Sequence, residues 1–134
     1  MRKLFCAVPF FAAAMIFFSS VCFAETLDLS DADFVFVDAR GTTGYYVDMN
    51  SLKFTGDHEV DARVEIIKAA ENRLFIYSIH FDRNKRTYQI LTSLNAQYDT
   101  KEKEGGSMVP LKVASYATGS PMESIVEYMY SPQP

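Results

Sequence analysis

The ten residues from Glu59 to Lys68 constrain the fold more than any other part of this chain, because apolar side chains alternate along them with charged ones. Side chains two residues apart share one face of a β-strand, so the segment predicts a strand with one buried face and one solvated face. The predicted buried face consists of Val60, Ala62, Val64 and Ile66.

Two more strands are predicted directly after this segment. Residues 73–82 place four large apolar side chains at alternate positions, and residues 86–98 form a long third strand. Short polar turns are predicted at Glu71-Asn72 and at residues 83–85. Three successive strands joined by short polar turns indicate an antiparallel meander. The alternating apolar residues of the second strand are Phe75, Tyr77, Ile79 and Phe81.

The chain before the meander predicts two shorter strands. Residues 33–38 form a compact strand signal bounded by acidic residues, and residues 45–48 form a second one. Two glycines and two threonines in residues 39–44 suit a turn between them. A further turn or a single helical coil is predicted just afterwards, because polar side chains there compete for nearby backbone amides. These polar residues are Asp48, Asn50 and Ser51.

The chain after the meander predicts a loop, a last strand and a helix. Residues 99–107 are expected to form an exposed loop, and residues 108–113 a strand with Pro110 at an edge of the sheet. A capping box with proline at the first helical position follows, formed by Ser120, Pro121 and Glu123.

The terminal helix should be about ten residues long, with one apolar stripe, and a helix of that length is marginal in water by itself. It should therefore lie on a face of the sheet, which makes the chain an α+β domain with one C-terminal helix. The stripe consists of Met122, Ile125, Val126 and Met129.

Residues 1–24 have the features of a cleavable secretory signal: two basic residues, an apolar stretch, and small residues one and three positions before the cleavage site. Cleavage is expected before Glu25, which leaves residues 25–134 as a single domain. An uncleaved anchor is the alternative, because residues 4–24 could just span ~30 Å of hydrocarbon. The small-residue end favours cleavage, so we expect an exported protein of the periplasm or cell surface, with no membrane span after cleavage.

Charge and cysteine content narrow the possible partners. Without Arg2 and Lys3, 11 basic residues stand against 17 acidic ones, a formal net charge of −6. Nucleic acids and anionic membranes need a basic face, so neither is expected as a partner. Both cysteines, Cys6 and Cys22, lie in the predicted signal, so no disulfide is expected in the domain. The residues before Cys22 do not match a lipidation signal.

The sequence shows no catalytic, cofactor or metal site. His58 and His80 have no second ligand at metal-site spacing, so structural roles are expected for both. No nucleophile motif is present, and a cysteine nucleophile is excluded in the domain. Asp38 and Asp48 could meet across a hairpin, although paired carboxylates on a small β-domain are mostly turn caps. We therefore expect a protein that is not an enzyme.

All eight tyrosines lie in the predicted domain, and tyrosine is enriched at protein interfaces. Aromatic residues on strands are more often packing residues, and that alternative stays open. The charged segment at residues 101–106 is expected to be solvated, which makes it a weaker candidate for partner contact. The candidate protein-binding residues are Tyr45, Tyr46, Tyr88, Tyr98, Lys101 and Lys103.

The order and spacing of several segments resemble the surface-adhesin protein E family of bacterial envelope proteins, over roughly residues 33–130. The segments that carry the resemblance are Tyr45-Tyr46-Val47-Asp48 followed by Ser51-Leu52, the charged strand at 60–68, Tyr77-Ser78-Ile79-His80-Phe81-Asp82 running into Arg83-Asn84-Lys85-Arg86 and Tyr88, and Gly119-Ser120 with Glu123, Ile125 and Val126.

The resemblance implies an antiparallel sheet of about six strands with the C-terminal helix against its concave side. It also implies an envelope protein, in some members a dimer, that binds host matrix or plasma proteins such as laminin and vitronectin. The expected function is thus a non-enzymatic exported protein with an adhesin-like surface for such proteins or for another envelope protein. The alternative is a soluble periplasmic module that binds a small ligand between sheet and helix.

The chain departs from the family pattern in three ways. Arg83 and Tyr130 stand where the family commonly has a disulfide-bonded cysteine pair. A tryptophan often found before the helix is missing, and Tyr116 is the nearest aromatic residue. The lipidation signal of a surface-tethered adhesin is missing as well.

Overall fold

The computed structural model describes residues 25–132, so the predicted signal at residues 1–24 lies outside the described part. In that part, seven strands form one antiparallel sheet in the order β1-β2-β3-β4-β5-β6, and β7 also pairs with β5. The strands are β1 Phe34–Arg40, β2 Thr43–Gly56, β3 Glu59–Lys68, β4 Arg73–Asp82, β5 Thr87–Gln97, β6 Lys103–Ser107 and β7 Ala114–Ser115.

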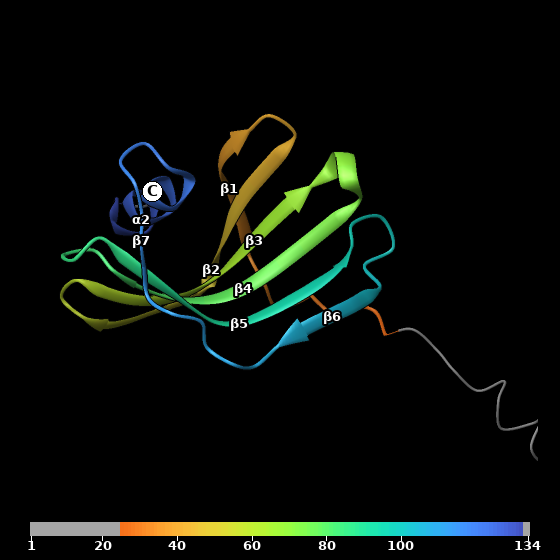
Figure 1. Cartoon of the computed structure of the whole chain (residues 1–134), viewed down its shortest axis with the longest axis horizontal. Helices are drawn as coiled ribbons and strands as arrows, with labels where there is room; N and C mark the ends of the chain where they lie inside the picture. Colours follow the sequence, from red (N-terminus) through yellow and green to blue (C-terminus); the bar gives the residue numbers. More distant parts are fainter. Residues whose placement is uncertain (1–24, 133–134) are drawn as a thin grey trace, which may run out of the picture.

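The sheet is curved, and the helix α2 (Pro121–Tyr130) lies in its hollow (Figure 1). Strand pairing aligns Val47, Val64 and Tyr77 in one row on this concave face. The helix buries Ile125, Val126 and Met129 against the same face. Each buried side chain contributes ~1.5–3 kcal/mol before conformational entropy is subtracted, which is enough to hold a short helix in place. The α+β fold predicted from the sequence is therefore confirmed.

The predicted cap of the helix is present. Ser120 Oγ accepts a hydrogen bond from the Glu123 N–H at 3.3 Å, and Pro121 occupies the first turn. The Glu123 carboxylate accepts the Gly119 N–H at 2.9 Å and forms an ion pair with Arg86. The carboxylate thus reaches one residue further back than in a standard capping box, and it ties the helix start to the residue before β5.

The central strands match the sequence predictions closely. The bounds of β3 and β4 are the predicted ones, and Val60, Val64, Ile79 and Phe81 are fully buried. The turn between the two strands contains a 3-10 turn (Ala69–Glu71) and ends at Asn72, whose φ of 53° is left-handed. Asparagine tolerates this conformation better than most residues, which explains its position here.

The turn predicted at Asp48, Asn50 and Ser51 is wrong, because β2 runs through these residues as one 14-residue strand. The pairing register with β3 shifts between Asp48 and Lys53, which marks a bulge. The Asp48 carboxylate does accept the Asn50 N–H, at 3.0 Å, as polar residues of this kind often do. Here that bond stabilises a bulge rather than ending the strand.

Two predictions near the C-terminus are also wrong. Residues 99–107 were expected to form a loop, but Lys103–Ser107 form the edge strand β6. Residues 108–113 were expected to form a strand, but they are irregular. Glycine has a low β-propensity, so Gly105 and Gly106 give no local signal for the strand that they form. Pro110 cannot donate to a ladder, so it interrupts the strand expected at residues 108–113.

Candidate functional site

Residues 108–113, named here the apolar segment, carry the most exposed large apolar side chains of the described chain. Single exposed apolar residues are common on proteins, but a contiguous group of them often marks an interaction site. Lys112 is the one charged residue of the segment. The exposed fractions are 81% for Met108, 70% for Val109, 56% for Leu111 and 61% for Val113.

The backbone of the apolar segment is held against β5 although its side chains are exposed. The Leu111 N–H donates to the Ile90 carbonyl at 2.9 Å, and the Gln89 side-chain amide donates to the Leu111 carbonyl at 3.0 Å. At its C-terminal end the segment continues into β7, which pairs with β5. The exposed side chains therefore belong to a fixed stretch of backbone.

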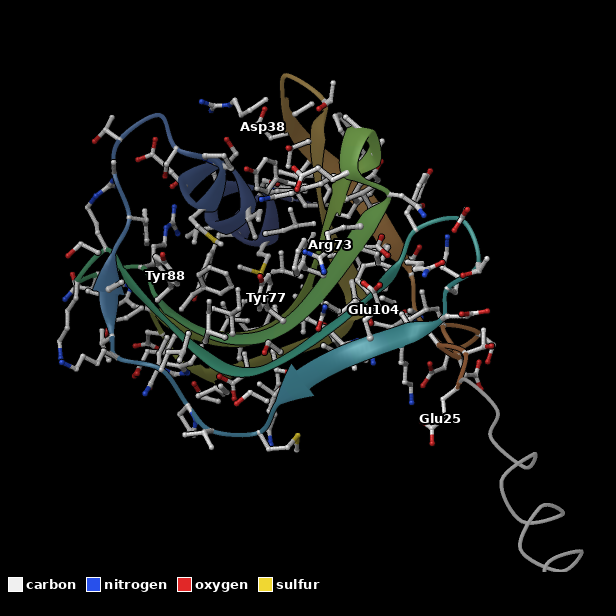
Figure 2. All side chains as sticks on the ribbon, turned by 45° about the vertical axis from the view of Figure 1, so that its right-hand side comes forward. Glu25, Asp38, Arg73, Tyr77, Tyr88 and Glu104 are labelled. Atoms are coloured by element: carbon white, nitrogen blue, oxygen red, sulfur yellow. The ribbon has the colours of Figure 1, made fainter. Side chains whose placement is uncertain are left out.

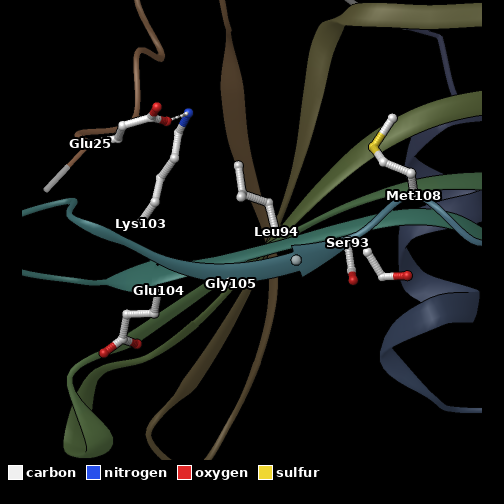
Figure 3. Close-up of a pocket in the computed structure, with 9 residues that line it drawn as sticks. Glu25, Ser93, Leu94, Lys103, Glu104, Gly105 and Met108 are labelled. Carbon is white, nitrogen blue, oxygen red and sulfur yellow. Dashed lines mark hydrogen bonds and ion pairs between the residues drawn. The ribbon is translucent and has the colours of Figure 1, made fainter.

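A pocket of about 440 Å³ lies beside the N-terminal end of the apolar segment (Figure 3). Leu94 and Met108 provide its apolar part, on the same side of the β5–β6 ribbon as Glu25 and Lys103. The Lys103 amine and the Glu25 carboxylate form an ion pair at 3.0 Å on the rim. The remaining lining residues are Ser93, Glu104, Gly105, Gly106 and Ser107.

Three smaller pockets lie elsewhere on the surface. One of about 220 Å³ lies beside His80 and Lys85, and one of about 230 Å³ lies over Arg63. The third, of about 310 Å³, is lined by polar and charged residues and by Tyr116. The helix contributes only Glu127 to these four pockets. None of the four is an aromatic cavity closed by the helix.

The structure does not bring the four candidate tyrosines into one surface. Tyr45 and Tyr88 pack against the core from the concave face, where Tyr88 lies on the same side as α2 (Figure 2). Tyr46 lies on the opposite face, edge to face with Phe36 at 5.5 Å between ring centres. Tyr98 is 38% exposed in the loop before β6. Tyr45 and Tyr88 are therefore packing residues, whereas Tyr46 contacts an aromatic ring that is itself exposed.

The two candidate lysines are engaged with groups of the protein itself. The Lys101 amine lies 4.5 Å from the centre of the Tyr98 ring and donates to the Tyr98 carbonyl. Lys101 also lies near Glu65, whose pKa is raised by burial and lowered in part by this positive charge. Lys103 pairs with Glu25 at the pocket rim. Of the two candidate lysines, only Lys103 thus lines the pocket beside the apolar segment.

His80 lies between two carboxylates on the face of the sheet opposite α2. Its Nδ1 is 2.6 Å from Asp61 Oδ1, and its Nε2 is 3.0 Å from Glu59 Oε1. The hydrogen bond with Asp61, followed by that with Glu59, raises the pKa of His80 above its ordinary value, although partial burial opposes this. The part of the chain that the structure describes holds no group of three or more potential ligands arranged for a metal ion.

Stability should depend on the charge of His80. Because its pKa is raised on folding, the His80⁺ interactions stabilise the protein below the unfolded-state pKa, and this contribution is lost as pH rises through the folded-state pKa. Thermal unfolding should show that the difference in Tm between wild type and His80→Gln shrinks from pH 6 to pH 9. His58→Gln, which leaves the Asp61–His80–Glu59 cluster intact, is the control. A Tm difference that is constant with pH would contradict this assignment.

Asp38 and Asp48 do not form a catalytic pair. Strand pairing places Asp38 opposite Tyr45 and Asp48 opposite Phe34, so the two carboxylates lie apart along the β1–β2 ladder. Asp38 pairs with Arg40 at 3.0 Å and accepts a hydrogen bond from Ser124 of α2 at 3.1 Å. Asp48 instead pairs with Arg63 at 2.8 Å and accepts two backbone N–H groups, so each carboxylate holds neighbouring elements together.

Arg83 and Tyr130 are in contact, although they are far apart in the sequence. The Arg83 guanidinium lies 4.6 Å from the centre of the Tyr130 ring, which joins the turn after β4 to the end of α2. These are the two positions at which the resemblance to the adhesin family places a cysteine pair. A cation–π contact thus links the elements that a disulfide would link.

A scan against protein-family models and searches of curated proteins and of solved structures find no match to this chain. None of the helices within residues 25–132 is long and apolar enough to cross a membrane. The resemblance stated above therefore stays a prediction, and the functional argument depends on the site itself.

Sequence reasoning missed the apolar segment as a surface, although two signals for it were present. Met108 and Val109 are consecutive apolar residues, which cannot both face the core from one regular strand. Pro110 between them and Leu111 also argues against a paired strand. An apolar run that lacks alternation and contains proline is poorly suited to a sheet, and here it is exposed.

Proposed function

We propose that this chain is a non-enzymatic exported protein of the cell envelope whose apolar segment binds another protein. The observation that carries the proposal is the exposure of four large apolar side chains, 56–81% each, within six residues of fixed backbone. Their burial against a partner would contribute free energy in proportion to the apolar area removed from water. An apolar patch with a polar rim is the usual composition of a protein-binding site.

The partner classes follow from charge and from the expected location. The features of residues 1–24 favour export, and a net charge of −6 in the rest of the chain disfavours nucleic acids and anionic membranes. A host matrix or plasma protein, another envelope protein, or a second copy of the chain would each fit a surface of this kind. The resemblance to the adhesin family supports the first of these classes.

The alternative of a small ligand between sheet and helix is less well supported. Small-molecule sites are usually concave, largely apolar cavities with a few convergent polar groups. The four pockets described above are open depressions, and the helix contributes one charged residue to one of them. The four most exposed large apolar side chains of the described chain lie beside the edge strand β6 and along β5 instead.

Site-specific photocrosslinking in intact cells tests the proposed function. A crosslinker at Val109, in the centre of the apolar segment, should give a discrete adduct with a second protein. The matched control is a crosslinker at Thr55, an exposed residue near the end of β2. Leu111→Asp should abolish the Val109 adduct while circular dichroism stays unchanged, because a charge in an apolar interface must be desolvated.

Two results would contradict the proposal. Equal adducts at Val109 and Thr55 would show that the contacts are nonspecific, and no adduct at Val109 would show that the segment has no partner. Protease treatment of intact cells then separates the partner classes. Digestion would place the domain outside, whereas protection until the outer membrane is opened would exclude host proteins.

A further inference from the structure

We infer that the outer edge of β6 binds an extended segment of the partner protein, which adds to the sheet as a further antiparallel strand. This inference rests on the proposed function and adds the mode of binding. In such strand addition, backbone hydrogen bonds provide affinity, and alternate side chains provide specificity.

β6 forms one edge of the sheet and is the edge that α2 does not contact in the described chain. Edge strands present unpaired N–H and C=O groups and are usually protected. β1 lies at the other edge, where α2 packs against it and Ser124 donates a hydrogen bond to Asp38. All five residues of β6 are exposed, and no described residue pairs with the outer side of residues 104–107. The free edge therefore lies next to the apolar segment.

Just before and at the start of β6 on the same edge, residues 101–103 already pair with the extended segment at residues 25–27. The Lys103 N–H donates to the Glu25 carbonyl at 2.8 Å, and the Leu27 N–H donates to the Lys101 carbonyl at 2.9 Å. Thr26 and Glu102 form an antiparallel bridge between these two bonds. The protein's own residues thus show that this edge can pair with an antiparallel strand. A partner strand would continue in line with residues 25–27, beside residues 104–107.

Glycine at position 105 is consistent with the close approach of another backbone to this edge. A glycine within a strand often marks a place where another chain approaches closely. A Cβ at Gly106 would lie 2.6 Å from the Ser93 carbonyl oxygen, so contact with β5 alone explains that glycine. A Cβ at Gly105 would meet only the Asn95 side-chain oxygen, at 3.1 Å. Contacts inside the protein therefore require glycine less strictly at position 105 than at position 106. The close approach of a partner backbone is consistent with glycine at position 105.

The pocket beside the edge indicates which side chains the added strand should carry. A strand of four residues covers ~13 Å, which matches the length of residues 104–107. Its side chains on the pocket side would lie over Leu94 and Met108, so apolar residues are expected at alternate positions. Beyond Ser107 the partner would reach the apolar segment, where further apolar side chains could be buried. Backbone pairing and apolar contact would thus be provided by adjoining parts of one surface.

The test uses the exported protein, purified after its amino-terminus has been determined by mass spectrometry. The probe is a capped hexapeptide of alternating threonine and valine, added at up to millimolar concentration in an NMR titration. We expect saturable shifts of the backbone amides of Gly105, Gly106 and Ser107, together with slower hydrogen exchange in β6. Gly105→Lys should weaken binding about tenfold, because lysine on an edge strand opposes pairing. Thr55→Lys, with the same charge change on β2, should bind like the wild type.

The wild-type titration decides the inference even if Gly105→Lys fails to fold. Shifts confined to residues 108–113, with unchanged β6 amides, would overturn strand addition but would leave the proposed function standing. Shifts of the β1 amides in place of the β6 amides would also overturn strand addition at β6, because the peptide would then bind the opposite edge of the sheet. The absence of any shift at millimolar peptide would also overturn strand addition. The proposed function would still be tested separately by crosslinking at Val109.

Discussion

Replacing Asp48 with alanine is expected to destabilise the protein by about 3 kcal/mol, because the change removes a buried carboxylate and leaves the partly exposed Arg63 guanidinium and two backbone amides without their acceptor. Asp48 is 1% exposed. Its carboxylate accepts hydrogen bonds from Arg63 at 2.8 Å, from the Asp33 N–H at 2.8 Å and from the Asn50 N–H at 3.0 Å. These bonds connect the start of β1, the bulge of β2 and β3. The midpoint of urea unfolding measures the loss.

Two matched variants identify what Asp48 contributes. Asp48→Asn keeps Oδ1 as the acceptor for the two backbone amides but places an amide donor where Oδ2 accepts from Arg63, so it loses the ion pair alone and should cost less than alanine. Asp31→Ala removes the other carboxylate near Arg63, at 4.0 Å, but that side chain is 85% exposed. A surface pair of this kind contributes ~0–1 kcal/mol. If Asp31→Ala destabilised the protein as much as Asp48→Ala, the role of burial would be refuted.

Acid unfolding gives a second measurement of how much Asp48 contributes to stability. Burial raises the pKa of Asp48, but hydrogen bonds from Asp33, Arg63 and Asn50 outweigh it, so the pKa lies below its ordinary value. A lowered pKa means that the stabilisation is present above the unfolded-state pKa of ~3.9 and is lost as pH falls through the folded-state pKa. The stability of Asp48→Ala should therefore depend less steeply on pH in the acid range than that of the wild type.

The strands that the sequence predicted well are the ones in the middle of the sheet. β3 and β4 have neighbours on both sides and one face on the core, so alternation along each strand reflects its true environment. β6 differs from these strands, because among the described strands it pairs only with β5, and that pairing determines its conformation. Residues such as Gly105 and Gly106 carry no local signal for that pairing. The bulge after Asp48 was missed for the same reason, since it depends on the register with β3.

The candidate site was harder to predict than the fold. Tyr45 and Tyr46 are neighbours in β2, so their side chains must point to opposite faces, and they could not have shared one surface. Whether Tyr88 is a packing residue or a surface residue depends on the curvature of the sheet and on the position of α2 (Figure 2). Neither property is encoded in a short segment. The apolar segment could have been inferred from Pro110 and from its lack of alternation.

The double variant Arg83→Cys/Tyr130→Cys is expected to form a disulfide and to raise the free energy of unfolding by up to ~4 kcal/mol. The two wild-type side chains are in contact, and the closed loop of roughly 48 residues removes substantial entropy from the unfolded chain. Residues 25–134 contain no other cysteine, so no competing pair can form in the domain. The Tyr130 hydroxyl is buried without a hydrogen-bond partner within the described residues, so its removal should cost little.

Thermal unfolding with and without reductant measures this effect in one preparation. The oxidised variant should melt roughly 10–20 °C above its reduced form. The reduced form should be less stable than the wild type, because it lacks the cation–π contact, which contributes ~0.5–1 kcal/mol, and also the packing of the Tyr130 ring against Phe54 and the core. Free thiols in the folded protein under oxidising conditions would show that the backbones are too far apart. A disulfide that forms without strain would mean that the end of α2 docks where the adhesin family closes its loop, which would strengthen the resemblance by a route independent of sequence.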